Sequence, residues 1–442
     1  MLNYPTNRDK LREKREKIMR AELLLPAGNM EKMKYAIKYG ADAVYLGTAD
    51  FSLRSPKSGN IITNDNLKEA VETAHKMGAK AYVTLNVFAN NEILAKLPEL
   101  IEHLQDIKPD GIIFADSGFY PALKKNLPNI PLHISTQANV LNYEAVKFWR
   151  DLGISRVILA RELSLKEIEE ISQKAPDIEL EVLAHGSICV AYSGRCLLSD
   201  YMSNNQRKAN QGNCTQPCRW SYKLKLTDDR RPDEEYELYE DEKCSYIMNP
   251  KDIALIQYIP DLIKAGVCSF KVEGRTKSMY YASLVAKAYK SAINAYYNGA
   301  TPAINELYKE LTSAGNRGFS SGFLIDKPDS EHYNYINGKG RAKSVFQAII
   351  TEKVSEDTYK IQVKNQMKSG ENFDLITPDE ELSIVINEMF DQYGEKIEIA
   401  NTNSEILVKI ENPPENWQWG IIRSKEKSGG QTETHLCSAT CN

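Results

Sequence analysis

The chain has 442 residues, more than one hydrophobic core usually organises, so we expect one large domain with a smaller one, or two to three medium domains. Its 42% hydrophobic and 26% charged content is globular, and no stretch approaches the roughly 18 uninterrupted apolar residues that a membrane helix needs. The net charge of −4 excludes a protein coated in positive potential, although this average conceals two basic stretches.

Residues 1–20 form a basic N-terminal extension, in which positions 8–20 hold seven Lys or Arg against three acids. Charges stand where a signal peptide would need an apolar core, so no export signal is indicated and a cytoplasmic protein is expected. In that reducing compartment the eight cysteines are not expected to form a disulfide framework. Five of them fall close together and indicate metal or redox chemistry: Cys189, Cys196, Cys214, Cys218 and Cys244.

Short apolar runs alternate with longer amphipathic segments between residues 21 and 340. The predicted strands are 22–26, 43–47, 81–87, 111–116, 132–137, 156–160, 180–184 and 269–273. Helical patterns include 66–77, 92–104, 143–152, 164–173, 252–265 and 278–297. Strands that alternate with helices indicate an α/β fold, and eight such units close most naturally into a (β/α)8 TIM-like barrel.

Polar side chains follow most of the predicted strands, where the chemistry of such barrels is found. They are Asn29, Asp50, Asn86, Asp116, Ser135, Gln137, Asn139, Arg161, His185, Ser187, Lys271, Glu273 and Arg275. Of these, His185, Ser187 and Glu273 are candidate catalytic residues. Helix capping is the alternative role for Asn29, Asp50 and Asp116.

The seventh unit carries a long insertion, because roughly 65 residues separate its strand from its helix, too many for an ordinary loop. This insertion, at about 186–250, holds the five clustered cysteines. A basic stretch at 207–231 has seven Lys or Arg against two acids, whereas 232–243 has seven acids and one Lys. The basic stretch encloses two of the cysteines and an aromatic pair, Trp220 and Tyr222, and the alternative for it is a solvated loop.

The pattern of residue types changes after Arg341, because apolar and polar positions alternate over residues 344–425. This alternation is typical of antiparallel strands and predicts a small β-barrel or sandwich domain. Residues 426–442, which contain Cys437 and Cys441, are expected to be a flexible tail, with a second metal site as the alternative.

The cysteine spacing favours an iron-sulfur cluster without excluding other states. Cys189 and Cys196 lie seven positions apart around a glycine, and Cys214 and Cys218 lie four apart. Zinc ribbons favour two-residue spacers, whereas iron-sulfur clusters tolerate irregular spacing, so zinc and plain thiols are the alternatives. Cys268, in the eighth strand, is expected to be an ordinary buried cysteine.

Several segments together resemble the peptidase U32, or collagenase-like, family. They are EVLAHGSIC at 181–189 with GRCLLS at 194–199, LLLPAGN at 23–29, GADAVYLG at 40–47, NQGNCTQPCRWSY at 210–222, YIMNPKD at 246–252, FKVEGRTKS at 270–278 and NRGFSSGF at 316–323. One departure is Leu183, where the family usually has Phe, a change of packing alone. The segment 344–425 resembles the family's C-terminal domain.

The resemblance implies an enzyme most like the tRNA uridine hydroxylases of the family, which make 5-hydroxyuridine at wobble position 34 with prephenate as cosubstrate. It implies a 4Fe-4S cluster on Cys189, Cys196, Cys214 and Cys218, with Cys244 as the alternate fourth ligand. Arg161, Lys271 and Arg275 are candidates to bind the two carboxylates of the cosubstrate. The expected partners are tRNA and either a paralogous chain or a second copy, and no membrane. For an RNA substrate, the candidate binding residues are Arg207, Lys208, Arg219, Trp220 and Lys223, which supply cations and an aromatic ring.

Other functions within the family stay open at this point. Relatives hydroxylate 23S rRNA or ubiquinone precursors, but the former are longer chains and the latter are shorter and paired. The family name implies proteolysis, for which His185 and Ser187 would be base and nucleophile. Two residues separated by one on a strand share a face without necessarily reaching each other, and no nearby acid orients the histidine.

Overall fold

A computed structural model describes residues 20–47, 50–53, 62–189, 191–204, 206, 207, 209, 212–220, 222, 224–228, 231–238, 249–325, 332 and 342–425. Lys208, Lys223, Cys244, residues 1–19 and the tail 426–442 lie outside these described residues. The chain divides into two compact units, Met1–Arg341 and Ala342–Asn442.

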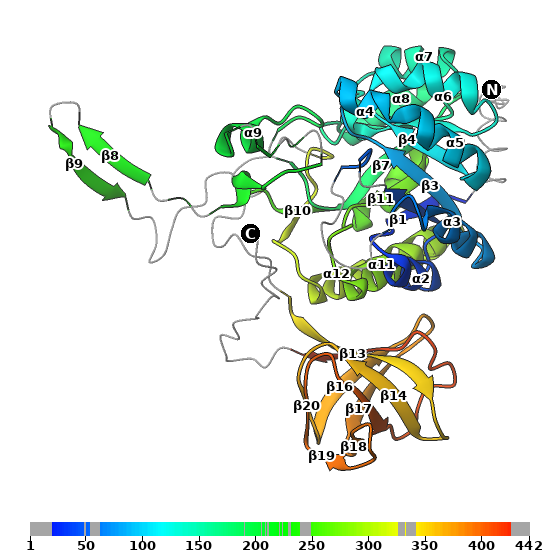
Figure 1. Ribbon diagram of the computed structural model, residues 1–442, viewed down its shortest axis with the longest axis vertical. Helices are drawn as coiled ribbons and strands as arrows, with labels where there is room; N and C mark the ends of the chain where they lie inside the picture. Colours follow the sequence, from blue (N-terminus) through cyan, green and yellow to red (C-terminus); the bar gives the residue numbers. More distant parts are fainter. Residues whose placement is uncertain are drawn as a thin grey trace, which may run out of the picture. The chain divides into compact units, whose positions relative to one another are not determined.

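Eight parallel strands close into a barrel in the first unit, as predicted (Figure 1). They are β1 (Glu22–Pro26), β2 (Ala43–Gly47), β3 (Lys80–Leu85), β4 (Gly111–Phe114), β5 (Leu132–Ile134), β6 (Arg156–Ile158), β7 (Glu179–Gly186) and β11 (Val267–Val272). Each pairs with its neighbour in this order, and β11 closes the ring by pairing with both β7 and β1. All eight strands were predicted because each is a short, nearly continuous apolar run, as expected of parallel strands covered on both faces.

Helices surround this barrel (Figure 1). They are α2 (Met30–Lys38), α3 (Leu67–Lys76), α4 (Asn91–Ala95), α5 (Leu97–Ile107), α6 (Tyr120–Asn126), α7 (Tyr143–Asp151), α8 (Leu165–Lys174), α10 (Ile259–Lys264), α11 (Met279–Tyr297) and α12 (Ile304–Ser313). The helix predicted over 92–104 is divided at Lys96, because Pro98 occupies the first turn of α5. None of the described helices is both long and apolar enough to cross a membrane.

The helix predicted over 252–265 is wrong in its first part. Asp252–Ala254 forms a short strand, β10, which pairs antiparallel with the end of β7 and parallel with β12 (Phe319–Ser320). Helix α10 begins only at Ile259, after a 3-10 turn. The edge of β7 beyond Leu183 therefore has a partner that the helical pattern did not reveal.

The insertion between β7 and β10 contains short elements. They are α9 (Leu198–Met202), the 3-10 turn η4 (Pro217–Arg219) and the antiparallel hairpin of β8 (Leu224–Asp228) and β9 (Arg231–Leu238). Figure 1 shows this hairpin and α9 in green. Helix α9 packs against η4, and this packing brings Cys196 near Cys214 and Cys218.

A buried charge network fills the start of the barrel interior. The Arg156 guanidinium, 3% exposed, lies 2.6 Å from Glu22, 3.1 Å from Glu181 and 2.8 Å from Glu179. The Ser269 hydroxyl lies 3.2 Å from Glu22 and 3.1 Å from Glu181. The strands therefore converge on one paired cation at the end of the barrel opposite the insertion.

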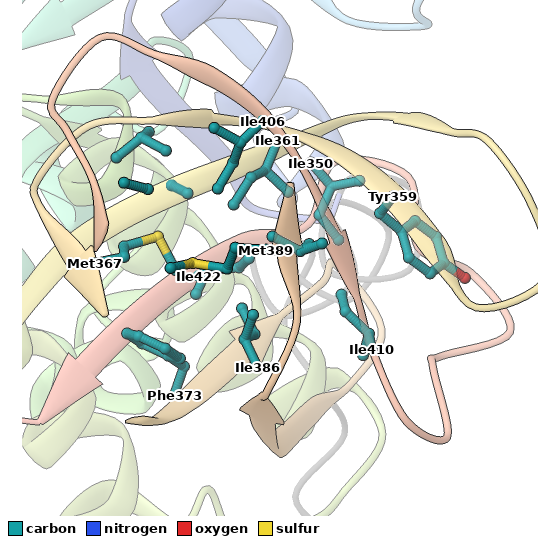
Figure 2. Packing of buried hydrophobic residues seen from close by; sticks show 14 of the residues in the cluster. Ile350, Tyr359, Ile361, Met367, Phe373, Ile386, Met389, Ile406, Ile410 and Ile422 are labelled. Carbon is teal, nitrogen blue, oxygen red and sulfur yellow. The ribbon is translucent and has the colours of Figure 1, made fainter. Parts of the chain in front are cut away.

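The second unit is an antiparallel β structure, as predicted. Its eight-stranded sheet comprises β13 (Ser344–Lys353), β14 (Thr358–Val363), β16 (Glu371–Ile376), β17 (Glu381–Ile386), β18 (Met389–Phe390), β19 (Lys396–Ile397), β21 (Glu405–Lys409) and β22 (Ile421–Lys425). A second pair is β15 (Met367–Lys368) with β20 (Ile399–Ala400). Figure 2 shows Tyr359, Phe373, Met389 and several isoleucines gathered in its core.

Candidate functional site

Four cysteines of the insertion come together just beyond the end of β7. All four are cysteines outside any disulfide and of intermediate exposure: Cys189, Cys196, Cys214 and Cys218. Burial raises the pKa of Cys196, and the neighbouring Cys189 and Cys214 raise it further. Burial and the other three cysteines likewise raise the pKa of Cys218, whereas the adjacent Arg219 opposes this change. Cys196 and Cys218 therefore lie within electrostatic reach of each other and of both Cys189 and Cys214.

Thiolates are the usual ligands of iron-sulfur clusters, and such a cluster places a different iron at each of four of them. The four cysteines are therefore a donor set that fits an iron-sulfur cluster. Among the described residues, no three His, Cys, Asp or Glu side chains lie close enough together to hold one metal ion.

The loop between Cys189 and Cys196 rests on the rim of the barrel. A methyl group at Gly194 would lie 2.2 Å from the carbonyl oxygen of Gln137, so only glycine permits this approach. Arg161 donates from Nε to the Ser193 hydroxyl at 3.1 Å, and Glu162 accepts the Ser193 backbone N–H at 2.8 Å. The end of β6 thus holds the middle of the cysteine loop.

The start of the same loop is held by a buried ion pair that the sequence did not single out. Arg317 forms this pair with Asp252, and it donates to the Ser187 hydroxyl at 3.1 Å. All three side chains are less than a tenth exposed. Arg317 and Asp252 belong to the segments NRGFSSGF and YIMNPKD, whose resemblance to the family was the available signal.

His185 is enclosed by aromatic rings and does not face an open pocket. Its ring centroid lies 5.7 Å from Tyr281, 5.4 Å from Tyr289 and 5.2 Å from Phe319. Burial lowers the pKa of His185 to about 3, and the positive charge of Lys277 contributes, so the imidazole is neutral at pH 7. Its Nδ1 lies 3.4 Å from the Tyr289 hydroxyl, and its buried Nε2 has no hydrogen-bond partner among the described residues.

The proposed serine-histidine pair is not formed. The Ser187 hydroxyl accepts from Arg317, while the His185 ring packs against the aromatic side chains. Glu273, which follows β11, is half-buried, and its backbone N–H donates to the His185 carbonyl at 2.8 Å. The three candidate catalytic residues are thus neighbours along paired strands.

The three candidate anion-binding residues lie at different depths. Arg161 is half-buried on the rim. Lys271 is inside the barrel rather than on the rim, 3.3 Å from Glu181, and burial lowers its pKa. Arg275 is 5% exposed and donates to the Leu53 carbonyl at 2.9 Å and the Thr84 hydroxyl at 3.1 Å. Only Arg161 therefore combines a rim position with substantial exposure.

Most other polar residues at the strand ends have structural roles. Asn29, Asp116 and Ser135 cap helical turns by accepting from Lys32, Gly118 and Gln137. Asp50 does not cap a helix but forms an exposed ion pair with Lys96 at 3.4 Å, and Asn86 accepts from Leu53. The capping alternative is thus confirmed for Asn29 and Asp116.

The described part of the basic stretch lies beside the cysteines. Arg207 donates to Asn213 at 2.5 Å, and Arg219 donates to Gln216. Trp220 is exposed, and its indole N–H donates to the Thr215 carbonyl at 3.2 Å. These contacts order two cations and an indole next to the two cysteines of η4 and the turn before it.

Comparison with known proteins gives two family matches. Residues 28–334 match the description "Peptidase family U32", and residues 342–423 match "Peptidase family U32 C-terminal domain". The tRNA hydroxylation protein P of Haemophilus influenzae is 38% identical over 424 residues, which cover 86% of this chain and 90% of that protein.

Two further relatives have other names. The collagenase of Porphyromonas gingivalis is 33% identical over 335 residues, covering 73% of this chain and 78% of its own. A 23S rRNA 5-hydroxycytidine synthase of Escherichia coli is 38% identical over 276 residues, covering 62% of this chain and 40% of its own.

Proposed function

The chain belongs to peptidase family U32, and we propose that it is a tRNA hydroxylase. Its cysteine site and its relatives support this function best. Its substrate is uridine at wobble position 34 of tRNA, and its product is 5-hydroxyuridine. The observation that carries the proposal is the grouping of four thiols on the barrel rim, in a chain that aligns over most of its length with a tRNA hydroxylation protein.

In this proposal, Cys189, Cys196, Cys214 and Cys218 hold a 4Fe-4S cluster. When bound, the cluster would supply a redox-active centre beside the rim. The chain's own contribution is positioning: the Arg317 contact holds Ser187, two residues before the first ligand.

The cosubstrate is prephenate, and its carboxylates require fixed cations. Arg161 is our first candidate, because its Nε contact with Ser193 orients the guanidinium on the rim beside the cysteine loop. Arg275 and Lys271 are more deeply buried, with their cationic groups 5.9 and 4.7 Å from the centroid of the Tyr45 ring. A planar guanidinium binds a carboxylate in a bidentate manner that lysine cannot reproduce.

Proteolysis is the competing function, and the geometry disfavours it. Acyl transfer by a serine needs a base within hydrogen-bond reach of its hydroxyl. The Ser187 hydroxyl instead accepts from Arg317, and His185 is enclosed by aromatic rings.

For the proposed hydroxylation, Glu273 is the best-placed acid or base among the three candidate catalytic residues, because it is not fully buried.

The decisive assay measures 5-hydroxyuridine on unmodified tRNA with prephenate titrated, alongside casein and gelatin cleavage by the same anaerobic preparation. We expect modified nucleoside and no proteolysis. Arg161→Lys and Arg275→Lys should each raise the prephenate concentration needed for half-maximal product formation roughly ten- to a hundredfold. Each variant loses a charge-assisted contact of about 1.5–3 kcal/mol. Proteolysis that survives removal of the cluster, with no modified nucleoside at any prephenate concentration, would contradict the proposal; modification of 23S rRNA alone would reassign the substrate.

Binding of tRNA should depend strongly on salt, because Lys and Arg that contact phosphates release bound counterions. We expect log affinity to fall linearly with log salt, and the Arg219→Glu and Lys223→Glu double variant to bind more weakly with a shallower slope. Filter binding at several salt concentrations measures both quantities. A slope unchanged by the double variant would remove residues 207–231 from the RNA contact.

A further inference from the structure

Exposed large hydrophobic side chains are concentrated in the insertion, relative to its length, compared with the rest of the described chain. Of the eleven such side chains that the structure describes as exposed, five lie between residues 192 and 220. The most exposed are Tyr201 at 80%, Leu197 at 68% and Tyr192 at 60%, followed by Trp220 and Met202. Exposed hydrophobic side chains concentrated in one short segment mark an interaction site.

Hydrogen bonds of a buried serine fix the backbone of the segment that carries these side chains. Ser199, fully buried in the middle of α9, donates to the Arg207 carbonyl at 2.7 Å and accepts from the Thr215 N–H at 3.0 Å. Leu197 and Tyr201 lie one helical turn apart, since the Tyr201 N–H donates to the Leu197 carbonyl at 3.0 Å. They therefore share one face of α9, while Ser199 points the other way.

Trp220 is a further exposed side chain, on the element next to α9. Helix α9 packs against η4, which Trp220 directly follows. The indole N–H is already satisfied by the Thr215 carbonyl, so the exposed part of the side chain is ring surface. We call Leu197, Tyr201 and Trp220 the α9 surface.

The charge around the α9 surface favours a polyanion over an apolar partner. The described residues between 191 and 222 include three basic side chains, Arg195, Arg207 and Arg219, and one acid, Asp200. That acid accepts the Ala209 N–H at 2.9 Å. Exposed aromatic rings among arginines are the combination on which unpaired nucleotides stack.

We propose that the α9 surface stacks the unpaired nucleotides of an RNA loop, next to the base that the enzyme modifies. This inference rests on the proposed function, which requires an RNA loop at the cysteine site. It adds Tyr201 and Leu197 to the basic residues that contact phosphates, and it assigns them a different task. Stacking holds the neighbouring nucleotides, whereas phosphate contacts set only the overall attraction.

The test measures binding of an anticodon stem-loop RNA to the holoprotein and to its Tyr201→Ala, Tyr201→Phe and Tyr393→Ala variants. Tyr393 is the matched control, because it is 81% exposed and belongs to the second unit. We expect Tyr201→Ala to weaken binding about five- to a hundredfold, the loss of one stacked base, and Tyr201→Phe and Tyr393→Ala to bind like the parent protein. The salt slope of Tyr201→Ala should equal that of the parent, because no charge is removed.

Three outcomes would overturn the inference. One is stem-loop binding by Tyr201→Ala equal to that of the parent protein. Another is equal weakening by Tyr201→Ala and Tyr393→Ala. A third is loss of self-association in Tyr201→Ala with RNA binding intact, which would make the α9 surface a contact between copies of this chain. If the parent protein forms 5-hydroxyuridine in these cases, the proposed function stands without the inference; if it forms none, the proposed function fails by itself.

Discussion

Protein prepared without oxygen is expected to be brown and to contain about four iron and four sulfide per chain, because four thiolates of this kind favour a cubane cluster. Single replacement of Cys189, Cys196, Cys214 or Cys218 by Ala should abolish the colour. Each of these thiols lies near the others in the folded chain, so the loss of any one leaves an incomplete ligand set. Iron and sulfide analysis with visible absorption measures the effect.

Cys268→Ala is the matched control for these variants. The Cys268 thiol lies in β11, 3.4 Å from the Leu180 carbonyl, and burial raises its pKa to about 12. Its charged neighbours are Arg156 and the carboxylates at the start of the barrel, away from the insertion. The variant should therefore keep its full content of iron and sulfide.

Two results would change the assignment in different ways. Stoichiometric zinc without sulfide, in protein prepared anaerobically, would contradict the cluster itself. Loss of colour in Cys244→Ala with colour retained in Cys218→Ala would replace the fourth ligand and leave the cluster intact. Far-UV circular dichroism of each variant separates loss of the cluster from loss of the fold.

Replacement of Arg156 by Met should be the most destabilising change in the barrel. It removes the cation that pairs with Glu22, Glu179 and Glu181, and it leaves Glu22 and Glu181 buried with less compensation. Breaking a buried ion pair from one side costs about 3–5 kcal/mol. Urea unfolding followed by far-UV circular dichroism reports this barrel, because the described helices all belong to the first unit.

The contribution of Glu22 to stability should depend on pH in opposite directions in the parent protein and in Arg156→Met. Burial by itself raises the pKa of Glu22, but Arg156, Tyr82 and Lys80 reverse this and hold it below its ordinary value. In the parent protein Glu22 therefore contributes stability above the unfolded pKa of about 4.3, and this stability is lost as pH falls through the folded pKa. Without Arg156, burial dominates, the folded pKa lies above the unfolded one, and stability is lost as pH rises.

The destabilisation by Arg156→Met should accordingly be larger at pH 8 than at pH 5. Arg150→Met is the control, because Arg150 pairs with its neighbour Asp151 at the surface of α7, where an ion pair is worth about 0–1 kcal/mol. Equal destabilisation by the two variants, or an Arg156→Met effect independent of pH, would show that the network does not stabilise the barrel.

The sequence alone was sufficient to predict the barrel and the class of the second unit. Each barrel strand is a local apolar run that the alternation with helices marks clearly, and strands such as β17 and β21 of the second unit show apolar and polar positions in turn. Strands β16 and β22 were not individually predicted. Each has a run of consecutive buried residues, Phe373–Ile376 in β16 and Ile421–Arg423 in β22, so its sequence lacks the alternation.

Residue types and spacing also pointed to the cysteine site, because thiolate chemistry needs particular side chains whatever surrounds them. What only the tertiary structure decided is which polar groups are exposed and which are paired. His185 is enclosed by three aromatic rings, Lys271 is paired with Glu181, and the Arg317 partners lie far from it in sequence. Burial and pairing depend on segments that meet only on folding, and no local pattern in a sequence encodes such meetings.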